Sequence, residues 1–181
     1  MERILRPALE YEDYASMPAD GKVYEVLDGD LSVTPAPSPY HQRVSKRLQR
    51  QLEAYFEARG LGEVFDAPID VILSRHDIVQ PDLVLVTDPT LVSARGIEGA
   101  PTLLVEVFSP SSVRQDRVVK ARRYAALGVP HYWMVDPDAR RVECYRAERG
   151  AYVLVVAAGA DATLEHPDWP GLAVRLTDLW S

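Results

Sequence analysis

The sequence contains little of what several common classes of protein depend on. Its 181 residues include one cysteine, Cys144, so no disulfide can form within the chain. No apolar run reaches the length of about 20 residues that a membrane-spanning helix requires. The segment from Met1 to Pro7 lacks the apolar centre of a signal peptide. We therefore expect a cytoplasmic protein that does not enter a membrane, with Cys144 as structural filler.

Several catalytic and binding motifs are absent as well. The chain has no glycine-rich phosphate loop, no dinucleotide-binding glycine pattern and no G-x-S-x-G nucleophile elbow. One cysteine and four scattered histidines do not make a structural zinc cluster. Positive charge is scarce, because 20 lysines and arginines stand against 27 acidic residues, a net charge of −7. This balance argues against binding nucleic acid through bulk charge, but it does not exclude a local basic groove.

What the chain does have is acidic residues inside apolar stretches. Glu106 stands in the run LLVEVF, residues 103–108, which predicts a buried strand. An ionised carboxylate in such a strand is costly unless a cation of the protein, a bound metal or a raised pKa compensates it. From this strand alone all three remain open, and a buried ion pair without chemistry explains Glu106 as well as a functional site does.

Asp82 occupies a comparable place. It precedes the apolar run from Leu83 to Val86 and follows Pro81, a residue that suits the start of a strand. If this strand and the Glu106 strand are neighbours in one sheet, the two carboxylates repel each other, and a divalent metal relieves that repulsion. Carboxylate oxygens suit a hard ion, so Mg²⁺ is the expected metal, with Mn²⁺ as a substitute.

Two segments before Asp82 also contribute polar residues. The Asp-Gly pair within residues 24–33 predicts a β-hairpin, with Glu25 on its first arm. A helix is expected over residues 39–59, because a Ser-Pro pair opens it and a glycine follows it, with His41 and Gln42 in its first turn. The simpler interpretations are an exposed strand position for Glu25 and an ordinary half-buried position for His41.

A second helix is expected over residues 113–128, after the Glu106 strand. Its Asp116, Lys120 and Tyr124 stand four residues apart and therefore share one face. The simple interpretation of Asp116 and Lys120 is a surface ion pair.

The rest of the chain is expected to complete one domain. A buried strand is expected over residues 129–135, and a closing hairpin over residues 140–157. The segment over residues 87–101 is expected to be a loop. Because no repeats or linkers interrupt the pattern, we predict one α/β domain over residues 1–181.

In this order the motifs resemble the PD-(D/E)XK nuclease superfamily, and more specifically the Uma-type family of putative restriction endonucleases. The similarity covers about residues 24–137. It rests on YEVLDG (24–29), on His41-Gln42 at a helix start, on QPDL (80–83), on VEVFSPSS (105–112), on Asp116, Lys120 and Tyr124, and on GVPHYWMVDP (128–137).

The resemblance implies a fold and a site. The fold is a restriction-endonuclease-like α+β core, with a mixed central sheet flanked by helices and with an added N-terminal hairpin and C-terminal strands. Asp82 and Glu106, together with Glu25, are implied as catalytic acids that hold Mg²⁺, with the backbone carbonyl of Val107 as a further ligand. The implied substrate is DNA, and the expected rim residues are His41, Gln42 and Asp116.

One departure from the superfamily pattern concerns its lysine. That lysine normally stands two residues after the glutamate, and the position here is Phe108. Lys120 is the natural substitute, because it follows in the next helix and is a lysine kept inside the arginine-rich run of residues 117–123. Its expected role is to orient the attacking water or to stabilise the oxyanion of the transition state.

Two other functions remain open from the sequence. A degenerate nuclease fold that only binds nucleic acid or protein accounts for Phe108 and for the acidic net charge. A small structural or oligomerising protein would use its acids in buried ion pairs. A nuclease that cuts both strands is expected to form a homodimer.

Overall fold

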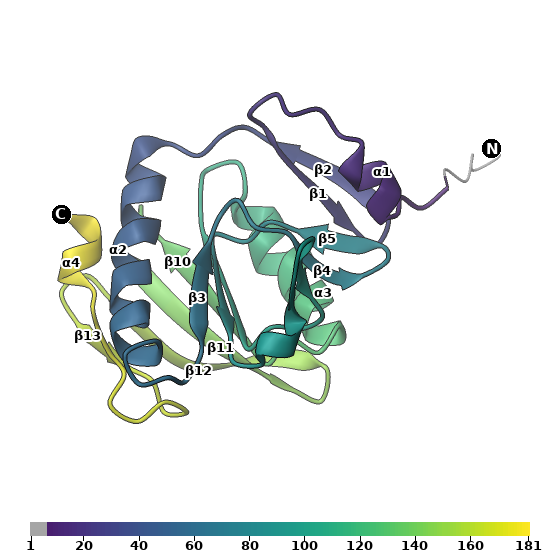
Figure 1. Ribbon diagram of the computed structural model, residues 1–181. Coiled ribbons are helices and arrows are strands. Elements are labelled where there is room, and N and C mark those ends of the chain that lie inside the picture. The colour runs from purple at the N-terminus through teal and green to yellow at the C-terminus, as the bar shows by residue number, and fades with distance from the viewer. Residues whose placement is uncertain (1–6) are drawn as a thin grey trace.

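The computed structural model describes residues 7–181 (Figure 1). The expectation that the first residues lack a signal-peptide centre falls mainly on residues 1–6, which lie outside the described part. In that part the strands form two six-stranded sheets and a two-stranded ribbon. The same residues contain no helix that is long and apolar enough to cross a membrane.

The central sheet has the strand order β12-β11-β10-β9-β6-β3. Strands β9 and β10 are parallel, and the chain crosses between them through the π-helix η2 and helix α3; the other neighbours are antiparallel. The closing hairpin expected from the sequence is confirmed as β11 and β12. The bounds are β3 Glu63–Asp66, β6 Leu83–Val86, β9 Leu103–Val107, η2 Gln115–Lys120, α3 Ala121–Ala126, β10 His131–Asp136, β11 Arg141–Glu148 and β12 Ala151–Gly159.

The second sheet, which we call the N-terminal sheet, has the order β2-β1-β5-β4-β8-β7. The predicted hairpin forms its β1 and β2, and Asp28 and Gly29 take the positive φ angles, 52° and 80°, that such a tight turn requires. The bounds are β1 Val23–Leu27, β2 Asp30–Thr34, β4 Val71–Ser74, β5 Asp77–Val79, β7 Val92–Ser93 and β8 Gly96–Glu98.

The mixed α+β class is confirmed, but the hairpin is not an addition to the central sheet. It pairs through β5 with a second sheet, and the expected loop over residues 87–101 supplies β7 and β8 to that sheet. These strands have two and three residues, which is too short for an alternating pattern to show in the sequence.

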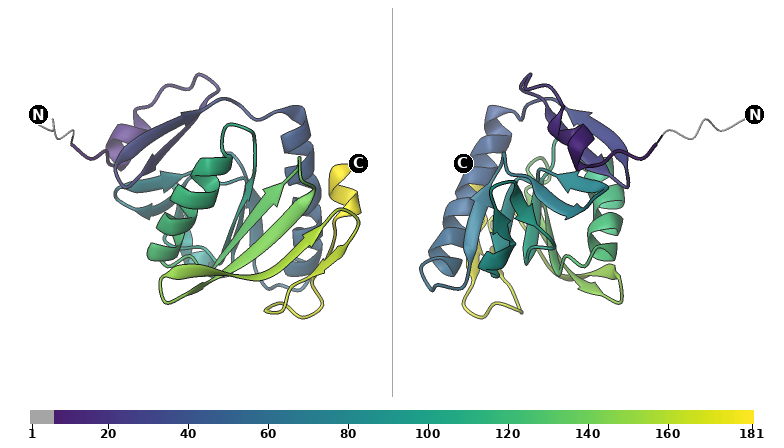
Figure 2. Two further views of the ribbon diagram at one scale, coloured as in Figure 1. Left: turned by 180° about the vertical axis from the view of Figure 1, so that it is seen from behind. Right: turned by 45° about the vertical axis from the view of Figure 1, so that its right-hand side comes forward.

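Helices cover both faces of the central sheet. Helix α2 (Pro39–Phe56) lies on one face and α3 on the other (Figure 2). Leu48 and Leu52 of α2 pack against the first face, and Tyr124 of α3 packs against the second. Along β9 the side chains alternate, so Leu103 joins the α2 cluster and Leu104 the α3 cluster. Glu106, two residues after Leu104, therefore lies on the α3 face.

The remaining elements are helix α1 near the start of the chain, a 3₁₀ helix after β6, and a two-stranded ribbon and helix α4 near the end. Helix α4 packs against α2 near the C-terminus, with Leu179 and Trp180 in the α2 cluster. Cys144 is completely buried in the same cluster. The bounds are α1 Tyr11–Ala15, the 3₁₀ helix η1 Pro89–Leu91, β13 Thr163–Glu165, β14 Ala173–Arg175 and α4 Thr177–Trp180.

The helix expected over residues 113–128 differs from the prediction in its first half. Residues Gln115–Lys120 form a π-helix, which follows an α-helical start at Val113 and Arg114 and precedes the α-helical residues Ala121–Ala126. The simple interpretation of Asp116 and Lys120 as a surface ion pair is also wrong, because Asp116 is 2% exposed and Lys120 is 5% exposed. Short π-helical segments often occur at functional sites, where they turn side chains inward.

An ion pair between the buried Asp77 and the partly exposed Arg123 joins the N-terminal sheet to α3. Asp77 has no exposed surface, and its two carboxylate oxygens accept hydrogen bonds from Arg123 Nε (2.6 Å) and Arg123 Nη2 (2.7 Å). The Asp28 N–H also donates to Asp77, at 2.9 Å. Burial alone would raise the pKa of Asp77, but the bonds from Arg123 and Ser74 outweigh it and hold the pKa below its ordinary 3.8.

We expect Asp77→Asn to lower the free energy of unfolding by about 3 kcal/mol, because it leaves Arg123 without its buried partner. The matched control is Asp28→Asn, since Asp28 pairs with the same arginine at 3.1 Å but has a 77% exposed side chain and should contribute little. The lowered pKa stabilises the fold above pH 3.8, so the difference between wild type and Asp77→Asn should shrink as the pH falls below that value. Urea unfolding at several pH values measures both effects, and equal losses for the two variants would contradict the assignment.

Candidate active site

One pocket contains every residue that the sequence predicted as a catalytic, metal-binding or rim residue. It has a volume of about 570 Å³ and lies where the start of β6 and the end of β9 meet β1 and the first turn of α2. Its walls include Glu25, His41, Gln42, Asp82, Glu106, Val107, Asp116 and Lys120.

Asp82 and Glu106 meet at neighbouring strands, as the sequence predicted. Strands β6 and β9 are antiparallel, with Leu83 opposite Val105, so the next step of the register places Asp82 opposite Glu106. The Val107 N–H donates a 2.7 Å hydrogen bond to Asp82 Oδ2. This bond fixes the Asp82 carboxylate at the end of β9, beside the Val107 carbonyl.

Lys120 lies at the centre of three carboxylates. Its Nζ is 2.9 Å from Glu25 Oε2, 3.0 Å from Glu106 Oε1 and 3.4 Å from Asp116 Oδ1. The Lys120 side chain is 6% exposed, so these contacts are made away from water. Glu25 is 3% exposed, and the interpretation of it as an exposed strand residue is therefore wrong.

Two further groups hold these acids in place, and the sequence did not single them out as site residues. The Tyr124 hydroxyl donates to Glu106 Oε1 at 3.0 Å. The Gln80 backbone N–H donates to Glu25 Oε1 at 2.9 Å. The sequence signal for Tyr124 was its position four residues after Lys120, on the same face of the helix. The Gln80 donor is a backbone N–H, and the residue type does not reveal such a contact.

His41 approaches the site from the first turn of α2. Ser38 caps this helix as expected, because its hydroxyl oxygen accepts the His41 N–H at 3.2 Å. The His41 ring donates from Nε2 to the Val107 carbonyl oxygen at 2.7 Å, and the same nitrogen is 3.3 Å from Asp82 Oδ2. His41 thus contacts two of the oxygen ligands that the sequence assigns to a metal, while Gln42 lines the pocket from an exposed position.

Charge and burial act in opposite directions in this pocket. Burial raises the pKa of Glu106 well above 4.5, since the opposing effect of Lys120 is smaller and Asp116 and Glu25 add negative charge. Burial alone would lower the pKa of Lys120, but Glu106, Glu25 and Asp116 together raise it well above 10.5. The Lys120 ammonium therefore stays charged. Burial likewise lowers the pKa of His41, but the hydrogen bond and charge of Asp82 outweigh it and raise that pKa above 6.5.

Phe108 fills the position at which the superfamily has its lysine. Its side chain is buried, and the Arg117 guanidinium lies 4.9 Å from the centre of its ring. The ammonium that reaches Glu106 is that of Lys120, which comes from the helix after the strand. The structure thus brings the proposed substitute lysine to the acid that the usual lysine would neighbour.

The donor set fits a hard divalent cation. Carboxylate oxygens and a backbone carbonyl are the ligands that Mg²⁺ prefers, and four acidic side chains line the pocket together with Lys120, Lys22 and the His41 imidazole. Within residues 7–181, however, the acids do not place three ligand oxygens within 4.8 Å of one another, because they surround Lys120 Nζ. A metal at Asp82 and the Val107 carbonyl would also have to replace the contacts of His41.

The fold and the sequence were compared with those of known proteins. The structure resembles a crystal structure of a putative nuclease belonging to DUF820 from Anabaena variabilis, with a TM-score of 0.76 and 16% sequence identity over 95% of this chain and 97% of that one. At this identity the likeness shows a shared fold. No curated protein sequence matches the chain. The profile of the Uma2 family of putative restriction endonucleases matches residues 11–177. Because this match spans most of the sequence, the chain belongs to the Uma2 family.

Proposed function

We propose that this protein is a Mg²⁺-dependent endonuclease that hydrolyses phosphodiester bonds in DNA. The observation that carries the proposal is the meeting of Asp82 and Glu106 on neighbouring strands, in one pocket with the Lys120 ammonium. An acid pair at strand ends with a buried ammonium is suited to phosphoryl chemistry, which needs positive charge beside the scissile phosphate. Membership of a nuclease family supports this reaction class.

The residues that would hold the metal are Asp82, Glu106 and the carbonyl oxygen of Val107, with Glu25 beside them. When bound, Mg²⁺ would supply a more acidic water and would neutralise charge on the phosphate. Mn²⁺ has similar oxygen preferences and is expected to substitute for it.

Lys120 is the group of the chain that we assign to transition-state charge. Its ammonium lies within 3.0 Å of Glu106 Oε1 and stays protonated, so it can donate a hydrogen bond to a phosphate oxygen or to the attacking water. Tyr124 and the Gln80 N–H keep Glu106 and Glu25 in place while Lys120 shifts its bonds toward the substrate. This fixed arrangement reduces the reorganisation that the reaction requires.

DNA is supported as the substrate by the surface beside the pocket. Arg43, Lys46 and Arg50 are exposed on α2, beginning two residues after His41. Basic side chains along a helix can contact successive phosphates, and such contacts give affinity that falls as salt rises. Cutting both strands requires two catalytic sites, so pairing of two copies on DNA stays a prediction.

The test is cleavage of supercoiled plasmid and of single-stranded DNA by the purified chain in Mg²⁺, in Mn²⁺ and in EDTA. We expect nicked or linear products with either metal and none in EDTA. Purified Asp82→Asn, prepared in parallel, excludes a contaminating nuclease. Equal activity of the two proteins would show that the cleavage does not come from this pocket.

One observation favours a second function, that of a module that binds nucleic acid or protein without cutting. Lys120 already neutralises the acids through three contacts, so the pocket has an internal counter-ion. If this is the function, plasmid stays intact in every metal while DNA or another partner still binds. Binding of Mg²⁺ at Asp82 and Glu106 separates the two functions, because a bare scaffold gains nothing from the metal.

A further expected result concerns His41. Because its ring holds the Val107 carbonyl and lies beside Asp82, we expect His41→Ala to bind Mg²⁺ about tenfold more tightly, the equivalent of one hydrogen bond of about 1.5 kcal/mol to a charged group. Isothermal titration calorimetry measures this affinity. Gln42→Ala, at the neighbouring exposed position, is the control and should bind like wild type. Weaker binding by His41→Ala would mean that His41 supports the metal site rather than competing for it.

A further inference from the structure

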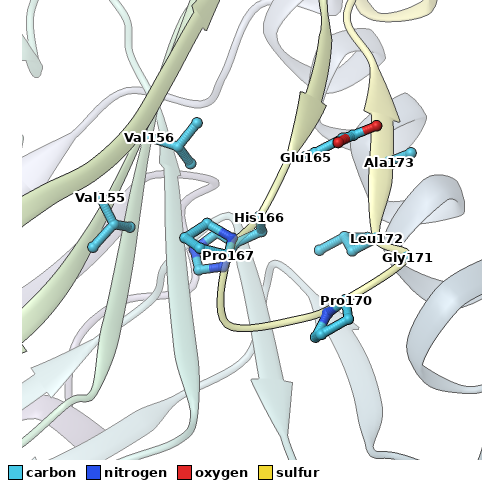
Figure 3. Close-up of a pocket in the computed structure, with 9 residues that line it drawn as sticks. All are labelled: Val155, Val156, Glu165, His166, Pro167, Pro170, Gly171, Leu172 and Ala173. Atoms are coloured by element: carbon cyan, nitrogen blue, oxygen red, sulfur yellow. The ribbon is translucent and has the colours of Figure 1, made fainter.

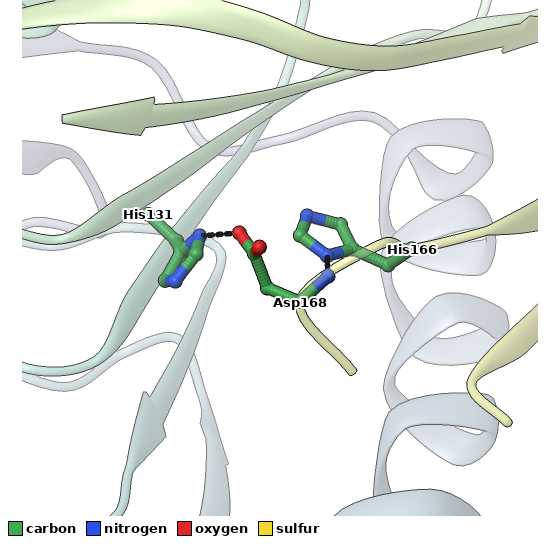
Figure 4. Close-up of side chains that lie close together, drawn as sticks. All are labelled: His131, His166 and Asp168. Atoms are coloured by element: carbon green, nitrogen blue, oxygen red, sulfur yellow. Dashed lines mark hydrogen bonds and ion pairs between the residues drawn. The ribbon is translucent and has the colours of Figure 1, made fainter. Parts of the chain in front are cut away.

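A cluster of side chains of the types that bind metals lies away from the candidate active site. His131 begins β10 in the central sheet, and His166 and Asp168 follow β13 near the C-terminus. Each offers one ligand atom, and the three atoms lie within 4.8 Å of one another. Figure 4 shows the Asp168 carboxylate between the two imidazole rings, with its oxygen 3.9 Å from His131 Nδ1. Four histidines that look scattered in the sequence therefore include two that the fold brings together.

The same three residues have buried polar atoms that make no hydrogen bond with the described part of the chain, and two of these atoms, His131 Nδ1 and Asp168 Oδ2, lie 3.9 Å from each other. Within residues 7–181, five buried side-chain nitrogens or oxygens make no hydrogen bond with the protein, and three of these are His131 Nδ1, His166 Nε2 and Asp168 Oδ2. Buried polar groups are nearly always paired, because an unpaired one costs about 1–3 kcal/mol. Three atoms without a hydrogen bond, on three side chains that meet in one place, favour a ligand between these side chains.

The surroundings hold the cluster in place from both sides. Arg146 Nη1 donates to Asp168 Oδ1 at 2.8 Å, which orients the carboxylate and leaves Oδ2 free. The Trp169 ring lies 4.5 Å from the His131 ring and 4.3 Å from the His166 ring, measured between centres. His166 also forms part of the wall of a separate pocket of about 550 Å³, next to Val156 and Leu172 (Figure 3). The cluster therefore lies close to a route from solvent.

We propose that His131, His166 and Asp168 bind a transition-metal ion of the Zn²⁺ type. Two imidazole nitrogens and one carboxylate oxygen are ligands that Zn²⁺, Co²⁺ and Cu²⁺ prefer and that Mg²⁺ does not. Three protein ligands leave a fourth position open to water. The ion would link the connection between β13 and β14 to the start of β10. His131 and His166 stand 35 residues apart in the sequence.

Binding of a metal ion requires the three side chains to move closer together. Ligand atoms on a tetrahedral Zn²⁺ at 2.0–2.1 Å lie roughly 3.3 Å apart, so the three residues must move inward. His166 Nδ1 accepts the Asp168 N–H at 3.1 Å, which places the proton of the neutral ring on Nε2. A metal at Nε2 moves this proton to Nδ1 and breaks that bond. A buried water is the alternative occupant, because it can contact three atoms at this wider spacing without any movement.

The experiment uses the full chain carrying Asp82→Asn, so that the candidate Mg²⁺ site does not contribute. Co²⁺ is added to the metal-free protein and its visible absorption is recorded, and Zn²⁺ is then titrated against a coloured chelator. We expect the intense absorption of four-coordinate Co²⁺, one Zn²⁺ per chain, and quenching of tryptophan fluorescence by Cu²⁺ because Trp169 contacts both rings. These readouts do not involve nuclease activity.

The variants decide whether these residues are the ligands. His131→Gln and His166→Gln should each weaken Zn²⁺ binding by more than about a hundredfold, which exceeds the usual effect of losing an outer partner. His76→Gln is the matched control, because His76 is also half-buried and its Nδ1 contacts the Leu9 carbonyl elsewhere in the fold. Melting in EDTA first establishes which variants fold. Because the His131 side chain is 12% exposed, we expect His131→Gln to fold, and this variant tests the proposal even if His166→Gln unfolds.

Three results would overturn the proposal. The first is a Zn²⁺ affinity that His131→Gln leaves unchanged. The second is Co²⁺ absorption of the weak six-coordinate kind. The third is a crystal structure grown with Zn²⁺ in which a water lies between the three atoms.

Discussion

Asp82→Asn is expected to lower Mg²⁺-dependent DNA cleavage by at least about a thousandfold, because it removes a ligand charge that supplies several kcal/mol of transition-state stabilisation. The fold should persist, since an asparagine oxygen can still accept the Val107 N–H that now bonds Asp82 Oδ2 at 2.7 Å. Loss of one charge from a pocket with four acids also reduces repulsion. Initial cleavage rates and melting curves of the same preparation measure the two effects.

The control for Asp82→Asn is Asp88→Asn. Asp88 is an exposed carboxylate that follows β6, outside the pocket, and accepts the Thr90 N–H at 3.0 Å. This variant should cleave at the wild-type rate. Cleavage by Asp82→Asn at that rate would show that the site has been assigned to the wrong residues.

The largest expected effect on stability is that of Lys120→Met. In EDTA we expect the free energy of unfolding to fall by about 3–5 kcal/mol, because Glu25, Glu106 and Asp116 lose the cation that all three contact. Methionine fills a similar volume, so packing alone does not account for a loss of this size. Mg²⁺ should restore more stability to this variant than to wild type, since it supplies charge where the ammonium was. Urea unfolding with and without Mg²⁺ measures both changes.

Lys22→Met provides the control for Lys120→Met. Lys22 pairs with Asp20 at 3.1 Å, but its side chain is 55% exposed, so the stability of this variant should stay close to that of wild type. If Lys120→Met were as stable as wild type in EDTA, the acids would not depend on Lys120 for compensation. The role of Lys120 as their internal counter-ion would then be wrong.

The acids of the site could be located from the sequence because their local pattern is unusual. Glu106 interrupts an apolar run and Asp82 precedes one, and both patterns place a carboxylate at a buried strand. The register of β6 and β9 then brings the two together. The spacing of Asp116 and Lys120 left a surface pair and a place in the site both open, because four-residue spacing on a helix looks the same on a surface as in a pocket. Only the resemblance to a nuclease family assigned the two residues to the site.

The features that the sequence did not predict depend on contacts between distant segments. Asp77 reads as a turn residue, and only the fold places Arg123 against it. The N-terminal sheet requires pairing of β4 with β8, which lie on either side of the Asp82 strand. His131 and His166 stand 35 residues apart and meet only because the C-terminal connection folds back onto β10. Such contacts leave no local periodicity.

The most direct test of the central claim is thermal melting of wild type and Glu106→Gln in EDTA and in millimolar Mg²⁺. Glutamine keeps the shape of the side chain and can still accept the Tyr124 hydroxyl, but it loses the ligand charge. A metal site made by these acids predicts that Mg²⁺ raises the melting temperature of wild type and leaves that of Glu106→Gln unchanged. An equal response of both proteins, or none in either, would contradict it and would favour a pocket whose acids are held by Lys120 alone.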